Sequence, residues 1–277
     1  MNLPELGQVG VSANGPRSFW RQVDGFVGRG SYHRVRRWLD PEWRYPHFVY
    51  AETVDELLKP GMRWLDAGCG HQAFEFRLSE QEKAAVARAA CAAGCDAYLP
   101  ALRTHRSLNK LVCCTLAALP FAPSTFDLVT LNMVAEHLSS PEVVFAGLVR
   151  ILAPNGLLVV YTPNASGYET LLSRIGSSLL PRKWTHGIIR FLEHRESQDV
   201  FPTFYRANTC RRLRELLGAS GLAQERISLL NGRPLLYFFA PLCALEILLN
   251  KVLRACGLRE FVGGTILAVY RNSGRPQ

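Results

Sequence analysis

From residue 52 onward, two hydrophobic patterns alternate along the chain, and together they predict an α/β fold. Short and almost continuous apolar runs are typical of parallel strands that are buried on both faces. Segments with apolar residues every three or four positions, or with many alanines, are typical of helices. The predicted strands lie at 63–67, in a segment ending at 96, and at 110–115, 126–131, 157–162, 225–230 and 265–270. The predicted helices lie at 52–58, 80–93, 141–152, 211–217 and 234–258.

This alternation favours a doubly wound, Rossmann-like sheet of seven mostly parallel strands with helices on both faces. We expect two helical insertions, at about 164–205 after the fifth strand and at 234–258 between the sixth and seventh. Residues 1–50 are expected to form a flexible or helical cover, either over a ligand or packed on the domain. Residues 51–277 are expected to form a single domain, which suits a chain of 277 residues.

The first predicted strand runs directly into a glycine turn, Asp66-Ala67-Gly68-Cys69-Gly70. Glycine at positions 68 and 70 allows a tight turn and leaves room for a ligand where a Cβ would clash. A dinucleotide site would instead need Gly-x-Gly-x-x-Gly, which places a pyrophosphate on a helix N-terminus. Because Asp66 precedes the glycines, the loop disfavours a pyrophosphate and a nicotinamide dehydrogenase. It favours a cationic or hydrogen-bond-donating ligand such as S-adenosylmethionine.

Several further motifs follow in order, and the whole set resembles the class I S-adenosylmethionine-dependent methyltransferases. The similarity is to small-molecule enzymes like the ubiquinone-biosynthesis O-methyltransferases, and it runs from about residue 60 to 164 with weaker similarity up to 271. The matching runs are Leu65 to Gly70, Leu119-Pro120-Phe121, Phe126-Asp127-Leu128-Val129, Glu136-His137-Leu138, Arg150 to Gly156 and Thr162-Pro163-Asn164.

The resemblance implies a cofactor site. It comprises Asp66, Gly68, Cys69, Gly70, Asp96, Thr115, Leu116 and Asn132. The glycine turn should lie under the methionine part of the cofactor, and Asp96 should accept hydrogen bonds from both ribose hydroxyls. Thr115 stands where many relatives carry an aspartate that contacts the adenine, so adenine recognition should rest on the Leu116 backbone. Tyr98 should pack either on the adenine or in the core.

The resemblance also implies catalytic roles for Glu136 and His137. His137 is the expected general base for a hydroxyl acceptor, since imidazole titrates near neutral pH. The open alternative is that the Glu-His pair only braces its helix. Some quinone O-methyltransferases hold a divalent ion with Glu-x-x-Glu-His, but here Met133 replaces the first carboxylate. A thioether is a poor ligand for hard cations, so we expect no required metal.

Two late segments remain open to more than one interpretation. His186, His194 and Tyr205 lie among the basic residues Arg182, Lys183, Arg190, Arg195 and Arg206. This cluster is expected either to clamp a phosphate or carboxylate of the acceptor or to form a solvated face. The continuous apolar run within 234–258 is too short for a membrane span. The segment is expected to be a hydrophobic lid, an interfacial membrane contact or a structural helix pair.

Composition narrows the function classes without naming an acceptor. The net charge of +9 suits anionic partners, but the basic residues are dispersed and nucleic acid is not expected. The eight cysteines include no Cys-x-x-Cys pair, which predicts that they are reduced. The N-terminal segment lacks the apolar core of a signal peptide, which predicts a cytoplasmic protein. Weak contact with an anionic membrane surface is left open. We expect methyl transfer to an oxygen of a small lipophilic or anionic metabolite. The alternatives are methylation of sugar or cell-envelope glycan intermediates, or a catalytically silent binding module; the oligomeric state stays open.

Overall fold

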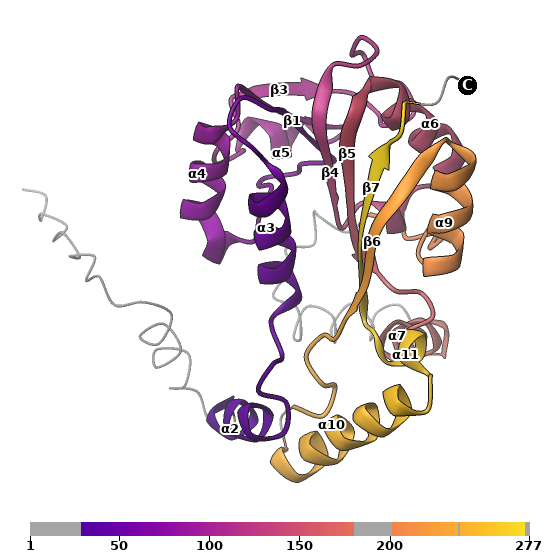
Figure 1. Cartoon of the computed structure of the whole chain (residues 1–277). Helices are drawn as coiled ribbons and strands as arrows, with labels where there is room; N and C mark the ends of the chain where they lie inside the picture. Colours follow the sequence, from indigo (N-terminus) through magenta and orange to yellow (C-terminus); the bar gives the residue numbers. More distant parts are fainter. Residues whose placement is uncertain (1–28, 180–200, 238, 275–277) are drawn as a thin grey trace, which may run out of the picture. The chain divides into compact units, whose positions relative to one another are not determined.

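The computed structural model describes residues 29–179, 201–237 and 239–274 (Figure 1). The chain divides into two compact units. The larger comprises Arg44–Arg233 with Val252–Gln277, and the smaller comprises Met1–Trp43 with Pro234–Lys251. The division expected from the sequence, 1–50 and 51–277, stays a prediction.

The larger unit is built around a seven-stranded sheet with strand order β3-β2-β1-β4-β5-β7-β6 (Figure 1). The strands are β1 (Arg63–Ala67), β2 (Cys91–Asp96), β3 (Lys110–Cys113), β4 (Phe126–Asn132), β5 (Leu152–Pro163), β6 (Leu222–Leu230) and β7 (Thr265–Asn272). In this sheet β7 runs antiparallel to β5 and β6, and the other pairs are parallel. The predicted seven-stranded, mostly parallel architecture is confirmed.

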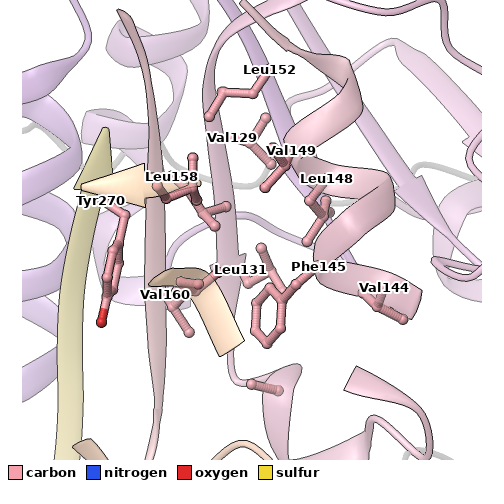
Figure 2. Close-up of a cluster of buried hydrophobic side chains, with 14 of the residues drawn as sticks. Val129, Leu131, Val144, Phe145, Leu148, Val149, Leu152, Leu158, Val160 and Tyr270 are labelled. Atoms are coloured by element: carbon pink, nitrogen blue, oxygen red, sulfur yellow. The ribbon is translucent and has the colours of Figure 1, made fainter. Parts of the chain in front are cut away.

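Helices α6 (Pro141–Ile151) and α9 (Cys210–Ala219) cover one face of the sheet. Figure 2 shows the core below α6, where Phe145 and Leu148 of the helix lie beside Leu131 of β4 and Val160 of β5. All four side chains are buried. Because α6 places apolar residues at positions 144, 145, 148 and 149, one continuous stripe faces the sheet.

Helices α3 (Pro46–Leu57) and α4 (Ser79–Arg88) cover the opposite face. Tyr50 of α3 stacks on Tyr161 of β5 with ring centroids 5.2 Å apart, and Trp64 of β1 packs in the same core. Each strand of the sheet's centre therefore contributes alternate residues to two separate cores, as a sheet covered on both sides requires.

Several predicted boundaries were wrong. The helix predicted at 80–93 ends at Arg88, because Ala92 and Ala93 are buried in β2 between β1 and β3. The tertiary position of this alanine-rich segment overrides its helix propensity. β5 begins at Leu152 rather than at residue 157, since the turn through Asn155 (φ 62°) lies inside the strand.

Other elements were absent from the prediction. They are α5 (Leu99–Arg103), α11 (Arg259–Val262) and the 3-10 turns η1 (Phe76–Leu78) and η2 (Ala135–His137). α7 (Tyr168–Leu179) lies in the first expected helical insertion. The second expected insertion contains α10 (Ala240–Ala255).

In the smaller unit, α2 (Arg29–Leu39) packs against α10. Cys243 and Ile247 of α10 are buried against Val35 and Leu39 of α2 and against Tyr237. The buried Glu246 carboxylate accepts hydrogen bonds from two backbone N–H groups, those of Leu235 and Leu236, each at 2.9 Å. This carboxylate fixes the chain that enters α10.

Candidate active site

The glycine turn after β1 requires both of its glycines for different reasons. Gly68 has φ 77° and Gly70 has φ 52°, a region that favours glycine. A Cβ on Gly68 would lie 2.5 Å from a methyl carbon of Val134, so the segment after β4 passes tightly over this residue. A Cβ on Gly70 would meet no atom within 4 Å. The turn is therefore packed on one side and open on the other.

Asp96 at the end of β2 anchors this turn. Its Oδ2 accepts a hydrogen bond from the Gly70 N–H at 2.9 Å, and its Oδ1 accepts one from the Tyr98 N–H at 2.8 Å. The Cys95 carbonyl accepts a further bond from the Gly68 N–H at 2.7 Å. A carboxylate oxygen has two lone pairs, so both oxygens of Asp96 keep capacity for hydroxyl donors.

Asp66 at the end of β1 is buried, and only one of its two carboxylate oxygens has a hydrogen-bond partner among the described residues. Its Oδ1 accepts a hydrogen bond from the Thr130 hydroxyl at 2.6 Å, whereas its Oδ2 has no partner among the described residues. Burial raises the pKa of Asp66 to about 8, against the opposing effect of the Thr130 bond, and the Glu82 and Asp96 carboxylates raise it further. A positively charged ligand beside Asp66 would stabilise its ionised form, so the pocket favours a ligand of that charge.

Glu82 is a site residue that the sequence analysis missed. Its carboxylate is buried, and it accepts hydrogen bonds from the backbone N–H groups of Ala73 at 3.2 Å and Phe74 at 2.8 Å. It also accepts one from the Ser107 hydroxyl. Glu82 thus joins the end of the glycine turn to the segment after α5. Its position four residues after the buried Leu78 was the available signal.

The remaining predicted cofactor residues differ in what surrounds them. Asn132 donates to the Ala73 carbonyl at 2.8 Å, and its buried Oδ1 has no partner among the described residues. Cys69 is buried beside Gly94, and burial raises the pKa of its thiol, so this side chain packs rather than reacts. Thr115 is exposed and Leu116 is half-buried just after β3, whose Cys113 pairs with Asp96. Asp66, the glycine turn, Asp96 and Asn132 lie at the carboxyl ends of β1, β2 and β4, and their role as a cofactor site stays a prediction.

Glu136 lies in η2, directly after β4, and belongs to a buried polar chain. Its Oε2 accepts a hydrogen bond from the Thr162 hydroxyl at 2.9 Å, and that hydroxyl accepts one from Asn208 Nδ2 at 2.6 Å. The Glu136 backbone carbonyl accepts from the N–H groups of Phe204 at 2.7 Å and Tyr205 at 3.1 Å. This chain links η2 to β5 and to the segment before α9.

The His137 ring has one nitrogen committed to the protein. Its Nδ1 lies 3.0 Å from the Pro202 carbonyl oxygen, which can only accept, so Nδ1 carries the proton of the neutral ring. Nε2 then holds the lone pair, and it lies 3.9 Å from Glu136 Oε1, beyond hydrogen-bond distance. The Phe201 ring lies 6.0 Å from the His137 ring and 5.9 Å from the Tyr98 ring. Phe201 thus connects His137 with the cofactor side of the site.

The basic cluster predicted in the first insertion lies mostly outside the described residues. His186, His194, Arg182, Lys183, Arg190 and Arg195 fall in that stretch. Within the described part, Arg206 donates to the Ser139 carbonyl at 2.5 Å, and the Arg174 guanidinium lies 5.6 Å from the Tyr205 ring centroid. These two contacts hold the segment after residue 200 against η2 and α7.

Two features, a metal-binding cluster and a membrane-spanning helix, are absent from the described residues. In that part of the chain, no three His, Cys, Asp or Glu side chains gather closely enough to hold a metal ion. The same residues include no helix with the length and hydropathy needed to cross a membrane. The expectation that no metal is required stays a prediction.

Comparison with known proteins agrees with the fold and the turn. Residues 65–160 match the family described as "Methyltransferase domain". The ubiquinone biosynthesis O-methyltransferase of Dechloromonas aromatica (strain RCB) is 28% identical over 58% of this chain and 74% of that protein.

Two solved structures share the fold. An S-adenosylmethionine-dependent methyltransferase from Mesorhizobium loti has a TM-score of 0.50 at 16% identity, covering 82% of this chain and 97% of that one. A putative methyltransferase from Haloferax volcanii, solved in complex with the Trm112 methyltransferase activator, has a TM-score of 0.51 at 15% identity, covering 88% and 97%.

Residues 65–160 match a methyltransferase domain, and the sheet topology is shared with solved S-adenosylmethionine-dependent methyltransferases, which defines the class that this chain resembles. Within that class, its sequence is similar to the ubiquinone-biosynthesis O-methyltransferases. The predicted methyltransferase resemblance and enzyme class are therefore confirmed, and the matched domain implies S-adenosylmethionine as the methyl donor.

Proposed function

We propose that this methyltransferase transfers a methyl group to an oxygen of a small lipophilic or anionic acceptor, with His137 as the general base. The observation that carries this proposal is the His137 ring, whose Nδ1–H is held by the Pro202 carbonyl and whose Nε2 is left with the lone pair. The similarity to a ubiquinone biosynthesis O-methyltransferase supports oxygen as the acceptor atom.

The residues around the glycine turn fit S-adenosylmethionine, which supplies an electrophilic methyl group on a sulfonium when bound. The partnerless Oδ2 of Asp66 suits a positively charged or N–H-donating group, and Asp96 suits a pair of hydroxyls. The open space beside Gly70 allows close approach to the backbone. We assign Asn132, Thr115 and Leu116 to the same site, with Cys69 as a packing residue of the turn.

In the proposed mechanism, His137 Nε2 takes the proton of the acceptor hydroxyl as the new bond to carbon forms. The Pro202 carbonyl orients the ring and stabilises the imidazolium that results, because Nδ1–H keeps its hydrogen bond. Glu136 acts as a positioning residue, since its carboxylate is buried and bonded to Thr162. Positioning of the acceptor supplies most of the remaining rate.

The test compares wild-type protein with His137→Gln and His137→Ala, using a radiolabelled methyl donor and a panel of phenols, catechols and hydroxybenzoates. We expect turnover to fall by about 10²–10⁴-fold in both variants. Binding of S-adenosylhomocysteine should stay within about twofold of wild type, which shows that the fold is intact. Near-full turnover in His137→Ala would remove the base assignment.

The same panel separates the alternative functions when it also includes sugars and nucleotide sugars. Turnover with those alone would favour an enzyme of sugar or cell-envelope glycan intermediates. Equal affinity for S-adenosylmethionine and S-adenosylhomocysteine, without turnover of any acceptor, would favour a catalytically silent binding module.

We also propose that the outer face of α10 contacts an anionic lipid surface. Leu242, Leu245, Leu248, Leu249 and Val252 are 39–62% exposed and are spaced so that they share one side of the helix. The opposite side, with Cys243 and Ile247, is buried. An exposed apolar stripe of this kind marks an interaction surface.

The charge and aromatic residues of the same unit support a lipid partner. Trp38 of α2 is 81% exposed, and Arg34 and Arg37 are exposed on the same helix. Tryptophan and arginine are typical of helices that lie at a membrane interface. The net charge of +9 also favours anionic lipids.

Sedimentation with phosphatidylglycerol vesicles at low salt tests this contact. We expect wild-type protein to sediment with the vesicles and Leu245→Glu to lose most of that binding. Val143→Glu is the matched control, because Val143 is a similarly exposed apolar residue on α6. Equal binding by both variants, or no binding by wild-type protein, would contradict the proposal.

A further inference from the structure

A cavity of about 700 Å³ lies in the larger unit between α9, the end of β6, the last turn of α10 and α11. Three arginines line it, Arg214 of α9, Arg254 of α10 and Arg259 of α11, together with a single acidic residue, Glu260. The lining therefore carries an excess of positive charge. Neither the cofactor turn nor His137 is part of it.

Two of these arginines are oriented by neutral amide groups. Arg214 Nε donates to the Gln224 side-chain oxygen at 3.1 Å, and Arg254 donates to the side-chain oxygen of Asn231. A neutral amide oxygen fixes a guanidinium without cancelling its charge. Elsewhere on α9 the arrangement differs, because Arg211 forms an ion pair with Glu215 at 2.8 Å. Arg214 lines the cavity and is held by a neutral side chain of β6 rather than by a carboxylate of its own helix.

The floor of the cavity is apolar and rigid. Ile227 and Leu229 of β6 line it and pack on the main core, and Cys210 beside them is buried. Burial raises the pKa of the Cys210 thiol, so this residue stays neutral. A ligand that suits these walls has an anionic head for the guanidinium groups and an apolar part for the floor.

The cavity lies toward the same edge of the sheet as the proposed active site. Leu230 at the end of β6 pairs with Thr265 of β7, and Thr265 pairs with Pro163 at the carboxyl end of β5. Asn164, the next residue, donates to the Glu260 backbone carbonyl at 2.7 Å, which fixes α11 to β5. The sheet order places β6 four strands from β1, about 19 Å at the usual strand spacing. The cavity is therefore separate from the cofactor turn.

We propose that this cavity is a binding site for an organic phosphate, with the phosphate or diphosphate group on Arg214 and Arg259. Guanidinium groups match phosphate oxygens in pairs of parallel hydrogen bonds, and several together suit a multiply charged anion. Arg254, held by Asn231, completes the positive wall. The apolar part of the ligand lies on Ile227 and Leu229. This binding does not depend on methyl transfer.

Calorimetric titration of the full chain with inorganic pyrophosphate, at constant ionic strength, tests the site. We expect saturable binding by wild-type protein and a loss of affinity of about tenfold or more in Arg214→Gln and in Arg259→Gln. Arg211→Gln is the matched control, since Arg211 lies on the same helix outside the cavity. Its affinity should stay within about twofold of wild type.

Parallel titration with S-adenosylhomocysteine keeps the result separate from the cofactor site. All three variants should retain wild-type affinity for it, which also shows that they fold. Absence of saturable pyrophosphate binding by wild-type protein would overturn the proposal, as would equal weakening in Arg211→Gln. Competition between the two titrants would place pyrophosphate at the cofactor turn and would overturn it too. Weaker binding of Arg214→Gln and Arg259→Gln to phosphatidylglycerol vesicles, without pyrophosphate binding by wild-type protein, would overturn the proposal and assign the arginines to a lipid-facing surface.

Discussion

The half of the sheet that contains β1 and β2 differs in construction from the half that contains β7 and β6. On the β1–β2 side, one short turn is tied down by two buried or half-buried carboxylates, Asp96 and Glu82, which bond to its backbone N–H groups. On the β7–β6 side, the arginine cavity is assembled from four elements that lie far apart in the sequence. The first arrangement fixes the backbone of a turn by local hydrogen bonds. The second brings together the side chains of residues that are distant in the sequence.

The largest effect that would sharpen this comparison is expected at the glycine turn. Gly68→Ala should destabilise the protein by about 3 kcal/mol, because the left-handed conformation costs about 1–2 kcal/mol and the overlap with Val134 adds a similar amount. Gly70→Ala should cost about 1 kcal/mol, since its Cβ meets open space. Urea unfolding without ligand measures both. Equal costs would mean that Val134 yields easily and the turn is less tightly packed than described.

The next effect concerns the pH dependence of stability through Asp66. Burial raises the pKa of this carboxyl to about 8 in the folded protein, well above its value in the unfolded chain. Between these two pKa values the unfolded state has released the proton that the folded state keeps, so stability falls as pH rises. From pH 6 to 8 we expect a loss of about 2 kcal/mol in wild-type protein. Asp66→Asn should lack this loss.

Unfolding of both proteins across that pH range, without cofactor, checks the assignment. The two proteins should differ most in stability at the alkaline end and converge below about pH 3, where Asp66 is protonated in both states. Parallel curves for the two proteins would show that Asp66 is not the titrating group.

A smaller effect is expected in the polar chain beside His137. Thr162→Val keeps the shape of the side chain but removes the hydroxyl that joins Glu136 to Asn208. Leaving these buried groups without that partner should cost about 1.5 kcal/mol. In the proposed mechanism Glu136 is a positioning residue for His137, so turnover should also fall. Unaltered stability and turnover would mean that the chain relaxes around the missing hydroxyl.

The smallest effect is expected on the outer face of α10. Leu245→Ala should change stability by less than about 0.5 kcal/mol, because Leu245 is exposed, whereas Ile247→Ala should cost about 2 kcal/mol or more. Thermal unfolding compares the two. A large cost for Leu245→Ala would show that the outer face is covered in solution by protein rather than left for a lipid surface.

Much of the cofactor side could be predicted because its information is local. Asp66, Gly68 and Gly70 lie within five residues, and β1 was predicted with its observed bounds. Asp96 followed from the end of the next strand. Glu82 and Thr130 could not be predicted in the same way, since their partners lie at distant positions such as Ser107 and Asp66.

The far side of the sheet was less predictable for the same physical reason. The short helix α11 carries a weak periodic pattern, and its position depends on contacts such as the bond between Asn164 and Glu260. The arginines of the cavity appear dispersed along the sequence, and only folding brings them together. In the sequence alone they were indistinguishable from a solvated charged surface.

The central claim is that the turn after β1, anchored by Asp96, binds S-adenosylmethionine. Calorimetric titration with S-adenosylhomocysteine tests it most directly, using wild-type protein, Asp96→Ala and the control Asp127→Ala. Asp127 is also a strand carboxylate, but it pairs with Arg63 at the start of β1 rather than with the turn. We predict micromolar binding that weakens at least about tenfold in Asp96→Ala and stays nearly unchanged in Asp127→Ala. No binding by wild-type protein, or equal affinities in the two variants, would contradict the account.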